Sequence, residues 1–245
     1  MRNYKEETER RVDFIKNLLK KSGANGIIYG NSGGKDCTLV SILCKKACDD
    51  TVGIVMPCGS TRNYSLDKSD AKELAAFYEI KTKDVDLGPI RSAIENAISI
   101  TTEISDSARA NIAPRLRMIT LYAIAASEGR LVAGTGNRSE GYMGYFTKWG
   151  DGAYDFNPIS DLTVTEVYEF LRYLNAPEFI FTKAPSAGLF EGQTDEKEMG
   201  VAYKAIDEYL FTGIANESDL KIIEEFHERS EHKRCMPTIY FNNTK

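Results

Sequence analysis

The spacing of apolar positions changes twice within the first 48 residues of the chain. Residues 6–21 carry apolar side chains at helical intervals among many charges, which predicts a surface helix. Residues 26–29 (Gly-Ile-Ile-Tyr) form a short apolar run typical of a buried strand, and residues 37–48 return to helical spacing. A strand, a glycine-rich turn and a helix in this order predict the first unit of a parallel α/β sheet.

The alternation of strand and helix patterns continues through the middle of the chain. Strands are predicted at 52–56, 80–85 and 131–133, and helices at 67–79, 89–99 and 107–127. We therefore expect an α/β fold with a doubly wound, mostly parallel sheet and helices on both faces, as in Rossmann-like folds. Residues 134–158 contain too much Gly and too many mixed polar and aromatic positions for a regular element, and a loop of this length predicts a functional role.

The last third of the chain is predicted to be helical with one loop. A helix begins at Thr163, where Glu166 completes a capping box, and ends near Pro177. Residues 182–194 are predicted to be a mobile loop, followed by a helix that starts at Asp195 and a charged helix at 218–230. No repeat or low-complexity linker divides the sequence, so a single domain of residues 1–245 is expected.

Composition narrows the class of protein. With 42% hydrophobic and 27% charged residues, the 245-residue chain has the make-up of an ordinary folded domain. A net charge of -5 provides no surplus of basic residues for a nucleic-acid backbone, and no run approaches the roughly 18 apolar residues of a membrane span. Five cysteines without a Cys-x-x-Cys pair predict a reducing compartment, the cytoplasm, and argue against a disulfide framework or a zinc site.

Residues 32–36 (Ser-Gly-Gly-Lys-Asp) lie at the junction of the first predicted strand and helix. Backbone N–H groups at a helix N-terminus favour a polyphosphate, Lys35 adds positive charge, and Asp36 is suited to hold Mg²⁺. A purely structural glycine turn is the alternative interpretation. A Walker A loop is excluded because Tyr29 and Asp36 stand where it needs Gly and Ser or Thr, and no Gly-x-Gly-x-x-Gly occurs.

This segment resembles the Ser-Gly-Gly-x-Asp-Ser loop of the N-type ATP pyrophosphatases, with Cys37 in place of the final Ser. Members of that family cleave ATP between its α and β phosphates. The resemblance implies that a carboxylate attacks the α-phosphorus and becomes an acyl-adenylate, from which an amine displaces AMP. Such a site works mainly by positioning and charge neutralisation.

A longer run in the middle of the chain resembles ammonia-dependent NAD synthetases. Residues 134–140 (Gly-Thr-Gly-Asn-Arg-Ser-Glu), residues 144–152 (Gly-Tyr-Phe-Thr-Lys-Trp-Gly-Asp-Gly) and Asp155 match that family's pattern in order and spacing. Segments 114–118, 183–187 and 230–234 resemble it as well. The resemblance implies ATP-dependent amidation of deamido-NAD to NAD, with AMP and pyrophosphate as products. The chain leaves no room for a glutaminase domain, so free ammonia or ammonia from a separate protein is the expected nitrogen source.

The resemblance also implies a role for each matching residue. The expected magnesium ligands are Asp36 and Glu140, and the expected catalytic residues are Asp36, Glu140, Lys148 and Asp155. The expected ATP contacts are Gly30, Asn31, Ser32, Gly33, Gly34, Lys35, Asp36, Cys37, Thr135 and Ser186. The expected deamido-NAD contacts are Arg115, Lys148, Asp155, His232 and Lys233. A homodimer is implied, with the predicted helix 107–127 as our candidate for part of the interface.

Two positions depart from the family pattern. Cys37 is a weaker hydrogen-bond donor than the usual Ser, and Val164 stands where these enzymes commonly place a Lys that reaches the triphosphate. Lys35 and Lys183 are the candidates to supply the missing charge. Two other functions remain open at this point: another adenylating pyrophosphatase, such as a tRNA-modifying enzyme, and a nucleotide-binding module with weak catalysis.

Overall fold

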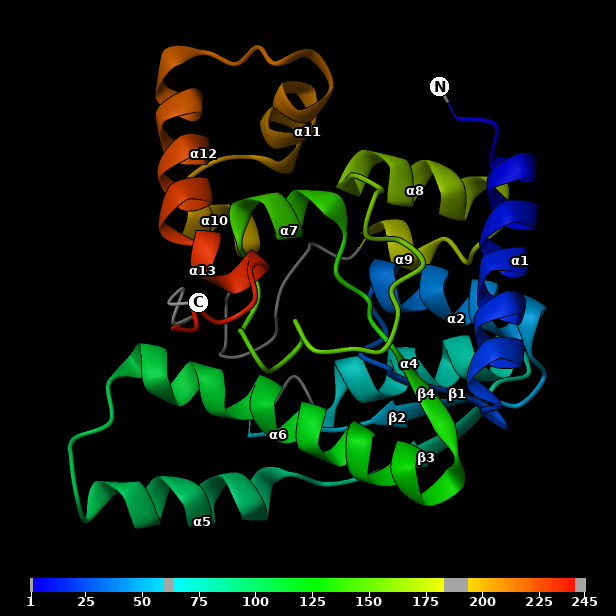
Figure 1. The fold of residues 1–245 in the computed structure, drawn as a ribbon, viewed down its shortest axis with the longest axis horizontal. Coiled ribbons are helices and arrows are strands. Elements are labelled where there is room, and N and C mark those ends of the chain that lie inside the picture. Colours follow the sequence, from blue (N-terminus) through cyan, green and yellow to red (C-terminus); the bar gives the residue numbers. More distant parts are fainter. Residues whose placement is uncertain (1, 60–63, 183–193, 241–245) are drawn as a thin grey trace, which may run out of the picture.

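The computed structural model describes residues 2–59, 64–182 and 194–240. Its central sheet has four parallel strands in the order β3-β2-β1-β4 (Figure 1). The strands are β1 Gly26–Gly30, β2 Thr51–Val55, β3 Lys81–Asp84 and β4 Arg130–Ala133. In the register, Ile28 of β1 is aligned with Val52 on one side and Val132 on the other. The chain winds outward from β1 to β3 and then returns to the other side of β1, which confirms the predicted doubly wound α/β class.

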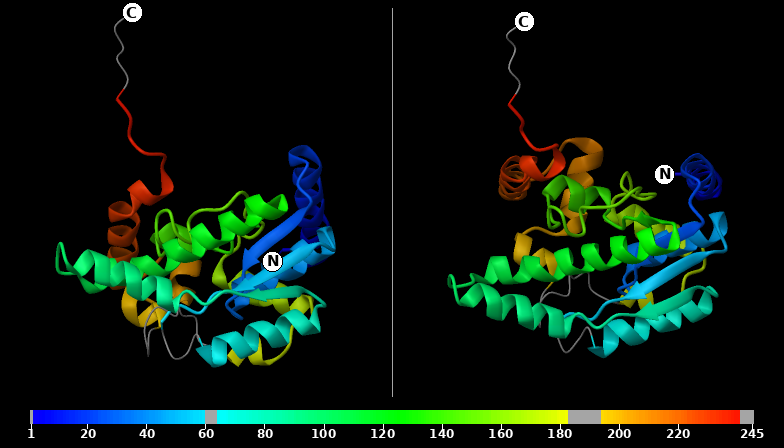
Figure 2. Two further views of the ribbon diagram at one scale, coloured as in Figure 1. Left: turned by 90° about the horizontal axis from the view of Figure 1, so that it is seen from below. Right: turned by 60° about the horizontal axis from the view of Figure 1, so that its bottom comes forward.

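Helices cover both faces of this sheet, and Figures 1 and 2 show them on its two sides. The helices that flank the sheet are α1 Tyr4–Ser22, α2 Lys35–Ala47, α4 Leu66–Phe77, α5 Gly88–Ser99, α6 Asp106–Glu128 and α8 Val164–Tyr173. The remaining described helices are α7 Arg138–Met143, α9 Phe179–Thr182, α10 Asp195–Met199, α11 Tyr203–Thr212, α12 Glu217–Arg229 and α13 Glu231–Arg234. Within the described ranges, no helix is both long and apolar enough to cross a membrane.

Strand β1 divides the sheet core into two layers. Ile27 and Tyr29 point to a cluster formed with α1, α2 and α8, whereas Ile28 points to a cluster formed with α6. This alternation follows from the two-residue period of a strand. Because both faces of β1 are buried, its apolar run is continuous, as the sequence pattern predicts.

A third apolar cluster lies among the helices rather than on the sheet. It joins α7, α8, α10, α11 and α12, with Met143, Val164, Tyr203, Ile206 and Ile223 at its centre. In Figure 1, α10 to α13 lie together on the opposite side from α1. The helices of this cluster therefore form a small layer of their own, attached to the α/β core through α7 and α8.

Helix α1 is fastened to the turn before α8 by arginines. The guanidinium of Arg11 donates to both carboxylate oxygens of Asp161, at 2.6 and 2.9 Å. Arg2 donates to Asp161 at 2.9 Å and to Glu166 at 2.6 Å. Burial raises the pKa of the Asp161 carboxyl, but the Arg11 hydrogen bond and charge outweigh burial and hold that pKa below its usual value.

The structure corrects the expectation that residues 134–158 lack a regular element. Helix α7 lies within this segment, and Asn137 begins it as the N-cap of a capping box with Glu140. The predicted helices at 6–21, 89–99 and 107–127 are confirmed within two residues at each end. Most of the predicted mobile loop at 182–194 lies outside the described residues.

Candidate active site

A cavity of about 960 Å³ lies at the carboxyl ends of the parallel strands. Its walls come from the segments that follow β1, β2 and β4, from α6, and from the segment after α7. Ligands of doubly wound sheets bind in this crevice, at the point where the strand order reverses. The volume is at the upper end of the range for small-molecule sites and leaves room for more than one ligand group.

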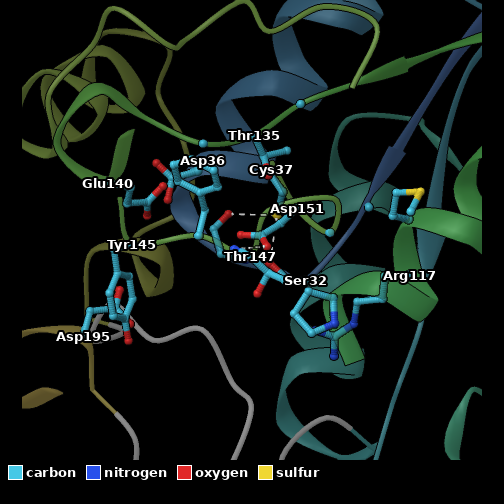
Figure 3. Close-up of a pocket in the computed structure, with 18 of the residues that line it drawn as sticks. Ser32, Asp36, Cys37, Arg117, Thr135, Glu140, Tyr145, Thr147, Asp151 and Asp195 are labelled. Atoms are coloured by element: carbon cyan, nitrogen blue, oxygen red, sulfur yellow. Dashed lines mark hydrogen bonds between the residues drawn. The ribbon is translucent and has the colours of Figure 1, made fainter. Parts of the chain in front are cut away.

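The loop between β1 and α2 forms one end of the cavity (Figure 3). Gly33 has a φ of +68°, and a Cβ there would lie 2.7 Å from the backbone nitrogen of Ala71, so no other residue fits. Asn31 donates to the Ala71 carbonyl at 2.9 Å and accepts from the Gly33 N–H at 3.2 Å. The Cys37 thiol donates to the Gly34 carbonyl at 3.1 Å. The loop is thus held rigidly with the N-terminus of α2 toward the cavity, which favours an anion.

Asp36 and Glu140, 104 positions apart in the sequence, lie together at this end of the cavity, as Figure 3 shows. Asn137 joins them. Its side chain donates to Asp36 Oδ1 at 3.1 Å, and its backbone N–H donates to Glu140 Oε2 at 3.1 Å. The side-chain amide oxygen of Asn137 accepts from the Glu140 N–H at 3.0 Å and so caps α7. One asparagine therefore orients both carboxylates.

The free oxygens of the two carboxylates face the ammonium of Lys35. Its Nζ lies 2.6 Å from Asp36 Oδ2 and 4.0 Å from Glu140 Oε1. Burial lowers the pKa of Lys35, but the charges of Asp36 and Glu140 outweigh burial and raise that pKa above its ordinary value. Desolvation in the cavity raises the pKa of Glu140, and the Asp36 charge adds to this effect.

Further charged groups line the cavity. Arg117 on α6 donates from Nε to the Met56 carbonyl at 3.2 Å, and desolvation lowers its pKa. Asp151 accepts from the Thr147 N–H at 2.9 Å, and desolvation raises the pKa of its carboxyl. Lys233 donates to the carbonyls of Gly144 and Phe146, both at 2.8 Å. Besides Lys35, Arg117 and Lys233 therefore supply cations along the cavity, as a ligand with several anionic groups requires.

Tyrosine and carboxylate pairs close the side of the cavity near α10. Tyr145 donates to Glu198 at 2.7 Å, and Tyr203 donates to the buried Asp195 at 3.1 Å. Asp195, Glu198 and Tyr145 line the cavity. The first bond ties the segment after α7 to α10, and the second ties α11 to α10.

Comparison with known proteins identifies the family. A family model described as NAD synthase matches residues 7–237. The NH(3)-dependent NAD(+) synthetase of Carboxydothermus hydrogenoformans is 46% identical over 240 residues, covering 97% of this chain and 98% of that protein. The chain belongs to the NAD synthase family. The NH(3)-dependent NAD(+) synthetase of Pyrococcus furiosus is 39% identical, covering 96% of this chain and 94% of that protein.

Solved structures of similar proteins share the fold over nearly the full length of the chain. NMN synthetase from Francisella tularensis superposes with a TM-score of 0.92 and 36% identity, covering 98% of this chain and 99% of that chain. NH3-dependent NAD synthetase from Campylobacter jejuni, in complex with the nitrate ion, gives a TM-score of 0.81 and 30% identity, covering 98% and 100%. The NAD synthase fold of this chain is therefore that of its solved relatives.

Most of the predicted ATP contacts of the NAD synthase site line the cavity. They are Gly30, Asn31, Ser32, Gly34, Lys35, Asp36, Cys37 and Thr135, with the predicted metal ligand Glu140 beside them. Gly33 does not line the cavity but shapes the loop, and Ser186 lies outside the described residues. The structure thus brings the predicted phosphate loop and the predicted metal ligands together in one place.

Fewer of the predicted dinucleotide contacts line the cavity. Lys233 lines the cavity, whereas Arg115, Lys148, Asp155 and His232 do not. Arg115 donates to the Lys148 carbonyl at 3.4 Å, and Lys148 Nζ donates to the His232 carbonyl, so these three form a connected group on the surface. The assignment of these three to the dinucleotide remains a prediction.

Asp155 has a structural position in this chain. Its carboxylate accepts from the Val132 N–H at 2.7 Å and from the Tyr122 hydroxyl at 3.2 Å. It thereby ties the segment after the cavity to β4 and α6. A role in catalysis or dinucleotide binding also remains a prediction.

Several charged residues that line the cavity received no role from the sequence, among them Arg117, Asp151 and Asp195. Arg117 and Asp151 lie within segments that resemble NAD synthetases, which was a usable signal, although Arg115 was chosen instead. Asp195 was interpreted only as a residue of a helix first turn. Nothing in its local sequence indicates that α10 reaches the cavity.

Proposed function

We propose that this protein is an ammonia-dependent NAD synthetase, a ligase that forms a C–N bond by amidating deamido-NAD at the expense of ATP. The observation that carries the proposal is the pairing of Asp36 and Glu140 at the N-terminus of α2, inside a cavity that Lys35, Arg117 and Lys233 also line. Membership of the NAD synthase family supports it.

The loop at 30–37 is suited to bind the triphosphate. Its backbone N–H groups and the N-terminus of α2 stabilise negative charge at the phosphates. Cys37 is directed to the Gly34 carbonyl, so its thiol stabilises the loop. We assign the α-phosphorus to the end of the cavity near Asp36, because the acid pair and Lys35 lie there.

Asp36 and Glu140 fit a magnesium ion. Both are hard oxygen ligands, and Asp36 Oδ2 and Glu140 Oε1 already face a single cation, the Lys35 ammonium. Within the part of the chain that the structure describes, no group of three His, Cys, Asp or Glu side chains forms a closed metal site. Magnesium here would keep waters or phosphate oxygens as its other ligands and would neutralise phosphate charge.

The chemistry then proceeds in two steps. The substrate carboxylate attacks the α-phosphorus, the bond to the β-phosphate oxygen breaks, and pyrophosphate leaves. Ammonia attacks the acyl carbon of the adenylate, loses a proton, and AMP leaves with one oxygen of the original carboxylate. Arg117 and Lys233, which also line the cavity, would bind the phosphate of the nicotinate nucleotide and so orient its carboxylate for attack.

The test is product analysis with an isotope. The protein is incubated with ATP, Mg²⁺, ammonia and deamido-NAD labelled with ¹⁸O in its carboxylate. We expect NAD, pyrophosphate and AMP that carries one ¹⁸O. Formation of ADP and phosphate, or of unlabelled AMP, contradicts the proposed route.

A second candidate substrate is nicotinate mononucleotide. The solved relative from Francisella tularensis is called an NMN synthetase and covers nearly the whole of both chains. The same two steps would convert the mononucleotide carboxylate to its amide. Comparing kcat/KM for deamido-NAD and the mononucleotide decides between them, because only the dinucleotide gains from contacts with the second nucleotide.

We also propose a homodimer that buries helices α5 and α6. These helices lie side by side and extend past the sheet (Figure 2). Helix α5 has no buried residue although it carries Ile90, Ile94 and Ile98, and Ile119 of α6 is 58% exposed. Apolar helix faces of this kind suit a second copy of the chain. Light scattering should give twice the chain mass, and Ile119→Asp should shift the protein toward the monomer.

We also propose a cytoplasmic location, where ATP for the proposed reaction is present. The five cysteines are all free thiols, as expected in a reducing compartment.

A further inference from the structure

The position of Lys35 inside the acid pair is the feature of the site that the predicted roles do not explain. Its side chain is only 6% exposed, and its Nζ is 2.6 Å from Asp36 Oδ2 and 4.0 Å from Glu140 Oε1. The rings of Tyr203 and Tyr168 lie 5.8 and 6.0 Å from the same ammonium. The ammonium is thus enclosed by two carboxylates and two aromatic faces, which fixes its position.

Two positive charges cannot share this place. A divalent ion held by both carboxylates would need the oxygens that now face Lys35, and like charges this close repel strongly away from bulk water. Lys35 must therefore withdraw from the acid pair before a divalent ion can bind there. Its side chain begins in the first turn of α2, next to the phosphate loop, so the phosphates are the nearest anionic groups that could receive it.

Position 164 lies behind the same wall of the cavity. Val164 is 4% exposed and packs in the cluster that contains Tyr203, with Tyr168 at its edge. Its backbone N–H donates to Ser139 at 3.2 Å, and its side chain does not line the cavity. The charge at this wall is therefore supplied by Lys35 from α2 and not from α8.

We propose that Lys35 is an exchangeable internal cation: it neutralises Asp36 and Glu140 when no divalent ion is bound, and moves to the triphosphate when the ion and ATP enter together. This inference rests on the proposed function, because it assigns the acid pair to the divalent ion. The exchange makes metal binding weak without nucleotide and couples it to ATP. It also leaves a positive charge for the departing pyrophosphate.

The experiment measures binding of Mn²⁺ alone, by calorimetry or by electron paramagnetic resonance, at mildly alkaline pH so that a proton does not replace the ammonium. We expect Lys35→Met to bind Mn²⁺ at least tenfold more tightly than the parent protein, a factor that corresponds to about 1.4 kcal/mol. Lys35→Arg keeps the charge and should remain weak. Lys35→Gln, uncharged but polar, should match Lys35→Met and replaces it if that variant does not fold.

Two controls locate the effect. Lys45→Met removes a lysine in the last turn of the same helix, whose Nζ lies 3.2 Å from Asp49, and should leave Mn²⁺ affinity unchanged. The double variant Lys35→Met, Asp36→Asn should lose the gain. Equal or weaker Mn²⁺ binding by both uncharged variants, or tight binding by Lys35→Arg, overturns the proposal. No nucleotide substrate is present, so this outcome is independent of which substrate is amidated.

Discussion

Replacing Gly144 by Ala tests how closely the C-terminal helices control the cavity. Gly144 ends α7 with a φ of +62°, and a Cβ built there would lie 2.1 Å from both Cβ and Oγ of Ser230. Gly213 ends α11 with a φ of +74°, and a Cβ there would meet nothing within 4 Å. The two substitutions share the backbone strain, and only Gly144→Ala adds the steric overlap.

The expected magnitudes follow from these two terms. A left-handed backbone conformation at an Ala lowers the free energy of unfolding by roughly 1–2 kcal/mol, and this loss is common to both variants. Overpacking against Ser230 adds roughly 1–3 kcal/mol for Gly144→Ala alone. At about 2–4 °C per kcal/mol for a chain of this size, Gly144→Ala should melt roughly 2–12 °C below Gly213→Ala.

The functional effect should separate the two variants as well. Lys233 donates to the Gly144 and Phe146 carbonyls, so a shift of this turn moves a cavity cation. Gly144→Ala should lower kcat/KM, while Gly213→Ala should keep it within about twofold of the parent, a difference under about 0.5 kcal/mol. Melting is followed by circular dichroism and turnover by pyrophosphate release. Equal melting temperatures and equal turnover in the two variants would contradict the steric overlap at Gly144 as the cause.

Three further outcomes are expected. Asp36→Ala and Glu140→Ala should each lower turnover by about 10² or more while circular dichroism stays native, because each removes an oxygen ligand of the proposed magnesium ion that neutralises the phosphates; near-normal rates at saturating Mg²⁺ would reject the assignment. Val164→Lys should lower the melting temperature, because it buries an ammonium in an apolar cluster, and should change turnover less than tenfold; a rise of 10² would show that a charge is missing at that position. Because the pKa of Asp161 is held below its unfolded value of about 3.9 by Arg11, its contribution is present above that pH and is lost as pH falls through the folded pKa. In Asp161→Asn, the stability toward urea should therefore fall less steeply than in the parent as the pH is lowered. The same pH dependence in both proteins would count against this linkage.

Much of the α/β core could be predicted because local patterns determine it. The run at 26–29 is apolar on both faces, and the strand is buried on both faces. Helix α7 was missed because its six residues are too few to show a helical period, although Asn137 and Glu140 form a capping box. The segment that contains them was interpreted only as part of a ligand-binding motif, whereas the same residues also begin a helix.

The site could be predicted only where contacts are local or follow the motif. Asp36 lies in the first turn of α2, directly after a loop whose geometry is fixed by its own glycines, so its placement was predictable. Arg117 and Asp195 reach the cavity because α6 and α10 are packed against distant elements, which no local pattern reveals. The place of Lys35 depends on a carboxylate more than 100 positions away, and the sequence alone could not indicate that it lies between two acids.

Asn137 limits how this site can change over evolution or by design. Its backbone and side chain cap α7 and hold Asp36 and Glu140 in fixed relation, and only 2% of its surface is exposed. A substitution at Asn137 would remove the side-chain cap of α7 and the hydrogen bond to Asp36 at once. Although Asn137 takes part in no reaction step, few substitutions should therefore be tolerated at this position. A library that varies Asp36 and Glu140 to change the metal preference should keep Asn137 constant.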